Sequence, residues 1–200
     1  MLTVLKVGYA KIMQLFYEDK LVKLHLREIA RQTQLFEPSA YRFLNALEHD
    51  DVLQSQKDGN LKKYSIKRGT KVYFIFQAFD LEKLDKLPSI RKNAINIYLN
   101  TLCEKPIFAI LFGSTAKQTY KQYSDIDILL ITNNKIATKK AEQEVYALAG
   151  ISISTFQITY SDFLTELKMK EDKVVQSALN YGYPLLNHIQ FYEVLYNERI

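Results

Sequence analysis

Two short apolar runs, "PIFAILFG" at residues 106–113 and "SDIDILLI" at residues 124–131, are separated by the ten-residue segment "STAKQTYKQY". Each run is rich in β-branched or aromatic residues and too short for an ordinary helix, so each predicts a buried strand. Side chains alternate along a strand, so Asp125 and Asp127 project to one face with Cα atoms about 7 Å apart. Two neighbouring carboxylates repel each other unless a cation neutralises them.

The bend between the two runs has the residues of a phosphate site. Gly113 permits a tight turn, and Ser114 is predicted to cap a helix whose free N-terminal amides would bind phosphate oxygens. An acid pair at the start of the next strand would hold Mg²⁺ against the same phosphates. The alternative is a plain loop between two strands.

The residues Gly113, Ser114, Asp125 and Asp127, at this spacing and in this strand context, resemble the signature of the DNA polymerase β-like nucleotidyltransferase superfamily. The resemblance covers about residues 95–196. It implies a mixed sheet covered by helices, a nucleoside triphosphate such as ATP, and Mg²⁺ or Mn²⁺. It also implies transfer of a nucleoside monophosphate to an acceptor hydroxyl with loss of pyrophosphate.

The resemblance assigns roles to particular residues. It makes Asp125 and Asp127 the catalytic and metal-binding pair, and Gly113 and Ser114 the nucleotide-binding turn. Lys117 is a further nucleotide-binding candidate, the other interpretation being a solvated helix face. Similar small domains act as drug-modifying transferases or as antitoxins that modify a partner protein, and some are joined to helix-turn-helix domains.

Two departures from the family pattern bear on activity. Family members commonly have Arg-Gly after the alanine, whereas this chain has Lys117-Gln118. A third carboxylate on a later strand usually completes the metal site, but the expected strand, "ISISTFQIT" at residues 151–159, contains no acid. Ser152 and Ser154 share one face of that strand, and a serine hydroxyl is not a base near neutral pH. The next acid, Asp162, is expected in the first turn of a helix.

The first third of the chain carries the whole basic excess. Residues 1–75 hold 13 Lys or Arg against 8 Asp or Glu, whereas residues 76–200 hold 14 of each. Apolar spacing predicts three helices, the first with Val4, Leu5 and Phe16 on its buried face, and Asp58-Gly59 predicts a hairpin after the third. Three helices and a hairpin resemble the winged helix-turn-helix family over about residues 3–67.

In that family the third helix enters the major groove of double-stranded DNA and the hairpin, or wing, contacts the backbone. Pro38 and Ser39 are expected in the first turn of the third helix, with Ser39 satisfying free amides. The alternative is a winged helix that binds protein or forms a dimer. The candidate DNA-binding residues are Ser39, Tyr41, Arg42 and Asn45 on the third helix and Lys57, Lys62 and Lys63 on the wing.

These segments predict an α+β protein with three parts: a winged helix over residues 1–68, a helical connector over 69–104 and a minimal nucleotidyltransferase-like domain over 105–200. The connector has an apolar stripe at Val72, Ile75, Phe76 and Phe79 that must pack on something. The second domain and a second copy of the chain, as a homodimer, are the two occupants considered.

The apolar runs and the cysteine content bear on the cellular location of the protein. No window approaches the roughly 18 uninterrupted apolar residues of a membrane helix, so no membrane partner is expected. A single cysteine, Cys103, fits a reducing cytoplasm.

Two function classes stay open at this point. One is a nucleotidyltransferase that modifies an unknown acceptor; the other is a DNA-binding regulator, antitoxin-like or otherwise, whose second domain binds nucleotide or a partner without turnover.

Overall fold

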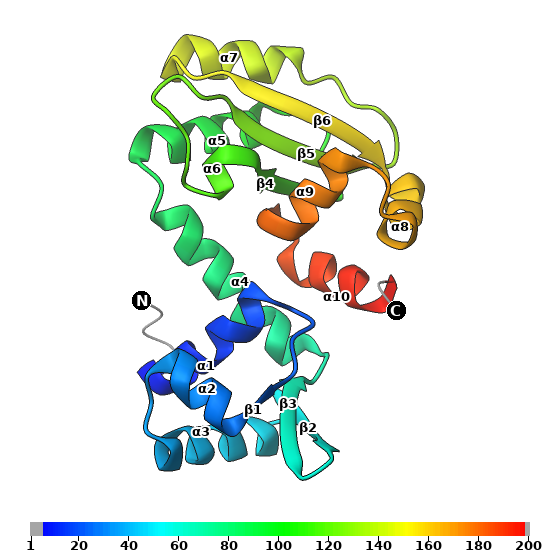
Figure 1. The fold of residues 1–200 in the computed structure, drawn as a ribbon. Helices are drawn as coiled ribbons and strands as arrows, with labels where there is room; N and C mark the ends of the chain where they lie inside the picture. The colour runs from blue at the N-terminus through cyan, green and yellow to red at the C-terminus, as the bar shows by residue number, and fades with distance from the viewer. Residues whose placement is uncertain (1–5, 199–200) are drawn as a thin grey trace. The chain divides into compact units, whose positions relative to one another are not determined.

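The computed structural model describes residues 6–198 and divides the chain into two compact units, Met1–Glu82 and Lys83–Ile200 (Figure 1). The first predicted helix begins later than its apolar spacing suggested, at Val7, and the predicted core positions Val4 and Leu5 lie outside the described residues.

The first unit is a winged helix-turn-helix. Its three strands form an antiparallel sheet in the order β1-β3-β2, and β2 and β3 are the wing, joined by a turn in which Gly59 has φ +59°. The elements in chain order are α1 (Val7–Glu18), β1 (Leu24–His25), α2 (Leu26–Thr33), α3 (Glu37–His49), β2 (Leu53–Asp58), β3 (Leu61–Ile66) and α4 (Thr70–Asp85), of which residues 83–85 belong to the second unit.

The predicted helix faces form the core of this unit, because Ile12, Ile29 and Leu44 are fully buried. Pro38 occupies the first turn of α3 as predicted, but the helix has no side-chain cap. The capping role assigned to Ser39 is therefore wrong: the N-cap position of α3 is Phe36, so Ser39 lies inside the helix, and its hydroxyl instead accepts a long hydrogen bond of 3.5 Å from Arg42.

The apolar stripe of α4 has an occupant that the sequence did not suggest. Tyr17 of α1 packs its ring against Phe76 and Phe79, with centroids 5.4 and 5.2 Å apart. The Tyr17 hydroxyl also donates a 2.6 Å hydrogen bond to the buried carboxylate of Asp80. Helix α4 is thus fixed to α1 of its own unit.

The second unit contains a four-stranded mixed sheet in the order β6-β5-β4-β7. Strand β4 pairs antiparallel with β5 and β7, and β5 pairs parallel with β6. The elements in chain order are α5 (Ser89–Thr101), β4 (Phe108–Phe112), α6 (Gly113–Ala116), β5 (Ile126–Thr132), α7 (Lys139–Ala149), β6 (Ile153–Thr159), α8 (Tyr160–Met169), α9 (Lys173–Tyr181), β7 (Tyr183–Leu186) and α10 (His188–Glu198).

Helices cover both faces of this sheet, and for that reason its two central strands are apolar on both sides. Leu111 and Ile128 belong to a core on one face that also contains residues of α5 and α7. Phe108 faces the other way and lies against Phe163 of α8, with ring centroids 6.2 Å apart. Helix α5, predicted as part of a connector over residues 69–104, contributes Tyr98 to the first of these cores.

Candidate functional site

The acid pair and the Gly-Ser turn lie at the same end of two paired strands. Phe112, the last residue of β4, is the register partner of Asp127 in β5. Gly113 follows Phe112 directly, so the turn leaves the sheet beside the Asp127 carboxylate. Antiparallel pairing brings together residues that are separated by a loop in the sequence.

Gly113 and Asp127 are in direct contact. Gly113 has φ +66°, a left-handed conformation that favours glycine, and a Cβ atom placed there would lie 2.8 Å from Asp127 Cγ and would collide with Asp127 Oδ2. The carboxylate therefore occupies the space that any other residue at position 113 would need.

The prediction that Ser114 caps a longer helix is wrong. Helix α6 is a single turn, its N-cap position is the extended residue Phe112, and no side chain caps it. The turn cannot continue as an α-helix because Gln118 adopts a left-handed conformation, with φ +57°. Instead, the Ser114 carbonyl accepts a 3.0 Å hydrogen bond from the Thr119 amide.

Ser154 lies beside both acids. It is the parallel register partner of Asp127, and its hydroxyl donates a 3.2 Å hydrogen bond to Asp125 Oδ2. The position on the third strand that neighbours the acid pair is thus filled by a serine. Asp162 lies in the first turn of α8, as predicted, and exchanges hydrogen bonds with Thr159 at the far end of β6.

The electrostatics of the pair favour a bound cation. Burial raises the pKa of Asp127 above its ordinary value, and the neighbouring negative charge of Asp125 raises that pKa further. Among the described residues no group of three or more His, Cys, Asp or Glu side chains is placed to hold a metal ion. Any ion at this site would have two protein carboxylates and would need other oxygen ligands.

Lys117, the predicted triphosphate contact, directly follows α6. Its ammonium lies over the ring of Tyr181 at the end of α9, 4.0 Å from the ring centroid. Both side chains belong to exposed residues. The cation is therefore near the turn but engaged with an aromatic face.

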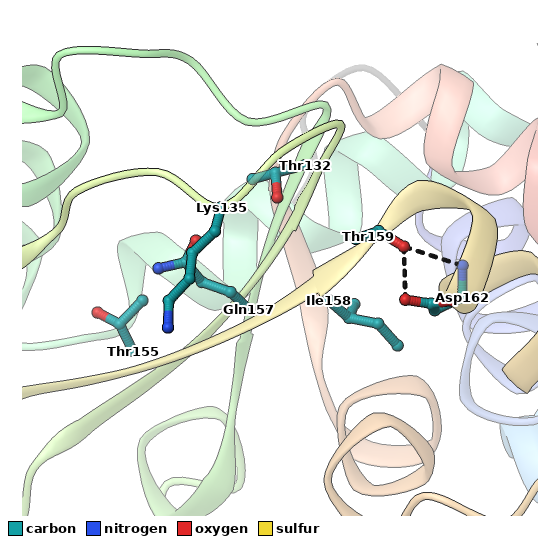
Figure 2. A pocket seen from close by; sticks show the side chains of 7 residues that line it. All are labelled: Thr132, Lys135, Thr155, Gln157, Ile158, Thr159 and Asp162. Carbon is teal, nitrogen blue, oxygen red and sulfur yellow. Dashed lines mark hydrogen bonds between the residues drawn. The ribbon is translucent and has the colours of Figure 1, made fainter.

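A cavity of about 380 Å³ lies elsewhere on the same unit (Figure 2). Thr155, Gln157 and Thr159 line it and alternate with Ser154 along β6, so they face the other side of the sheet. The Gln157 amide forms hydrogen bonds with both the backbone nitrogen and the backbone oxygen of Ile136. Asp162 also lines this cavity, but neither Asp125 nor Asp127 does, so the cavity is separate from the acid pair.

The predicted DNA-contacting residues lie on α3 and the wing. Tyr41 and Arg42 are exposed, and Ser39 and Asn45 are half-buried. On the wing, Lys62 forms an ion pair with Glu48 at 2.7 Å, and Lys63 pairs with Asp58 at 2.6 Å. These two cations already have anionic partners within the unit.

Lys57 differs from its two neighbours on the wing. It is exposed, and within residues 6–198 no ion pair is found for it. A groove of about 580 Å³ between α3 and the wing is lined by Tyr41, Leu61 and Tyr64 among others.

In the part of the chain that the structure describes, no helix is long and apolar enough to cross a membrane.

One family model matches most of the second unit of the chain. The family model "Polymerase beta, Nucleotidyltransferase" matches residues 93–188. The uncharacterized protein ycf53 of Porphyra purpurea is 26% identical over 138 residues, which is 68% of this chain and 55% of that protein. This chain therefore spans little more than half the length of that relative.

Two solved structures are similar at low TM-scores. MepR, a transcription regulator of the Staphylococcus aureus multidrug efflux pump MepA, is 15% identical, with a TM-score of 0.32, over 46% of this chain and 73% of that chain. TrmBL2, an archaeal chromatin protein described as showing a novel mode of DNA binding, is 17% identical, with a TM-score of 0.30, over 89% of this chain and 71% of that chain. Residues 93–188, which carry the Gly-Ser turn and both aspartates, form a domain of the polymerase beta nucleotidyltransferase family that follows a winged helix in this chain.

Proposed function

We propose that the second unit transfers a nucleoside monophosphate from a nucleoside triphosphate to an acceptor hydroxyl. Asp125 and Asp127 would hold the divalent ion, and the backbone of Gly113 and Ser114 would receive the phosphates. The observation that carries the proposal is the contact between Asp127 and Gly113, because it brings the acid pair and the turn to one place.

The donor set fits Mg²⁺. This ion binds oxygen ligands and in nucleotide enzymes usually takes one or two carboxylates, completing its shell with water and substrate phosphates. Asp125 and Asp127 form a site of that kind, in which burial and then the neighbouring charge of Asp125 raise the pKa of Asp127. Mn²⁺ accepts the same ligands. When bound, the ion would neutralise charge on the phosphates and bring the reacting oxygens together.

The residues of the chain have distinct tasks in this proposal. Asp127 and Asp125 position the ion, and the Ser154 hydroxyl orients Asp125 through its hydrogen bond. No carboxylate lies at the Ser154 position to accept the proton of the acceptor hydroxyl. A general base contributes about 10² to 10⁴ in rate, so we expect slow transfer that depends on positioning and the ion.

The test is incubation with Mg²⁺ and ATP labelled at the α-phosphate, together with lysate proteins and small hydroxylated acceptors. Label should appear on an acceptor with the wild type and be lost in Asp125→Asn and Asp127→Asn. Asp162→Asn is the matched control, since it removes an aspartate at the other end of β6. Transfer that survives in both site variants would refute the proposal.

A second candidate function rests on the first unit. The basic excess is confined to residues 1–75, and α3 exposes Tyr41 and Arg42. We infer that this unit binds double-stranded DNA, with phosphate replacing the internal partners of Lys62 and Lys63. A regulator that binds nucleotide without turnover would combine this activity with the acid pair of the second unit.

The DNA proposal makes a specific prediction about Glu48. Replacing it by Gln removes the anion that now pairs with Lys62, so the Glu48→Gln variant should bind duplex DNA more tightly than wild type. Lys57→Gln should bind more weakly, and its slope of log affinity against log salt should fall by about 0.9 if one phosphate contact is lost. Fluorescence anisotropy over a salt series measures both. Binding that neither substitution alters, or that does not depend on salt, would argue against DNA as the ligand.

A further inference from the structure

Arg91 is a buried cation that belongs neither to the Gly-Ser turn nor to the acid pair, and it lies outside residues 93–188, which the family model matches. It is the third residue of α5, and only 2% of it is exposed. Burial lowers the pKa of Arg91, but a guanidinium stays protonated at any ordinary pH. Removing such a charge from water is costly unless hydrogen bonds compensate, so the partners of this side chain indicate its role.

The partners of Arg91 are all on the chain that joins the turn to the acid pair. Nη1 donates to Thr115 Oγ1 at 2.9 Å, and Nη2 donates to the carbonyls of Ser124 and Lys121 at 2.8 and 3.2 Å. The guanidinium also lies over the ring of Tyr120, with Cζ 4.0 Å from the centroid. The planar group is thus held by three acceptors and an aromatic face.

These contacts join the two halves of the candidate site. Thr115 is two residues after Gly113, and Ser124 directly precedes Asp125. Residues 117–125 contain no helix or strand, so side-chain contacts add to a few backbone hydrogen bonds in holding this segment in place. We infer that Arg91 is a positioning residue that holds the turn and the acid-bearing loop in the arrangement needed to bind a divalent ion.

The geometry of the guanidinium matters as well as its charge. Five N–H donors in one plane let Arg91 reach acceptors in both the turn and the acid-bearing loop and stack on Tyr120 at the same time. A lysine keeps the charge but has one nitrogen, so it would hold either the turn or the loop, but not both. Residues that support metal ligands in this indirect way typically affect metal affinity by about 10- to 100-fold.

This inference rests on the proposed function, so the test has one measurement that involves the ion and one that does not. Arg91→Lys keeps the charge and removes the branched, planar guanidinium. Tyr98→Phe is the matched control, because it alters a buried residue of the same helix whose 2.7 Å hydrogen bond goes to Thr155 of β6 and not to the loop. Hydrogen exchange of the amides of residues 119–125 reports loop order, and Mn²⁺ titration followed by electron paramagnetic resonance reports the site. Both are measured well below the melting temperature.

The expected result is faster exchange across residues 119–125 and Mn²⁺ affinity lower by at least about tenfold in Arg91→Lys. Tyr98→Phe should lower the melting temperature and leave both readouts at their wild-type values. Unchanged loop exchange in Arg91→Lys, or equal Mn²⁺ affinity in that variant and wild type, would overturn the positioning role. If wild type binds no Mn²⁺, the proposed function fails, and loop exchange alone then decides whether Arg91 orders the segment.

Discussion

Replacing Gly113 by alanine separates the cost of a left-handed backbone from the cost of displacing Asp127. Gly150 ends α7 with φ +64° and has no atom within 4 Å of the position of an added Cβ, so it is a matched control for the backbone alone. An L-residue in this conformation costs about 1–2 kcal/mol, partly offset by a less flexible unfolded chain. Gly150→Ala should therefore reduce the free energy of unfolding by about 1 kcal/mol.

Gly113→Ala should cost more, because the new methyl group occupies the space of the Asp127 carboxylate. Pushing that side chain away from its rotamer adds about 0.5–1.5 kcal/mol, so we expect a total loss of about 1.5–2.5 kcal/mol. Asp127→Ala removes the colliding atoms. In the Gly113→Ala/Asp127→Ala double variant the cost of the alanine at 113 should fall back to about 1 kcal/mol, a coupling of about 0.5–1.5 kcal/mol.

Urea denaturation of the four variants and wild type gives these free energies, and Mn²⁺ titration gives the state of the site. Gly113→Ala should lose ion binding, whereas Gly150→Ala should keep it. Equal stability losses in the two single glycine variants would refute the reasoning, as would additive losses at positions 113 and 127. Either result would mean that Asp127 does not pack against the turn.

Three further predictions concern the same unit. Gln118→Gly should stabilise the protein by about 0.5–1 kcal/mol in urea denaturation, because Gln118 has φ +57° and glycine adopts that conformation without strain; a loss of stability would contradict this. Ser154→Asp places a carboxylate beside Asp125 and Asp127 and should raise the transfer rate by about 10² or more, which the label assay measures. The folded-state pKa of Asp127 is raised, so its contribution to stability is present below the unfolded pKa of about 3.9 and is lost as pH rises through the folded pKa. Asp127→Asn should therefore melt at a higher temperature than metal-free wild type at neutral pH, with the difference shrinking on acidification, and a constant difference would exclude this explanation.

The parts of the fold that could be predicted from sequence are those in which local pattern and tertiary packing agree. The runs around Ile110 and Leu129 are apolar throughout because both faces are covered, and Asp58-Gly59 marks the wing because the turn needs a left-handed residue. Asp125 and Asp127 were found as a pair because strand alternation follows from sequence alone. Their contact with Gly113 required the register of β4 and β5, which the sequence does not specify.

The remaining features depend on partners far along the chain. Helical spacing after Ser114 suggested a long helix, but the chain must return to β5, and Gln118 ends the turn in a conformation that its side chain disfavours. The stripe on α4 was recognised, while its contact with Tyr17, about sixty residues earlier in the chain, was not. Arg91 gave no signal, because an arginine in the first turn of an amphipathic helix is normally exposed.

The position of Arg91 also determines where the protein can be cut. A recombinant fragment that starts at residue 93, where the family match begins, or at residue 105, where apolar composition suggested a boundary, would lack this side chain. The later start would also remove Tyr98 and the rest of α5 from beneath the sheet. Such a truncated polypeptide would keep both aspartates and the glycine, but the turn and the acid-bearing loop would be poorly ordered. A lack of activity in that fragment would therefore say nothing about the intact chain. Shortened versions for biochemical work should therefore begin at or before Lys83.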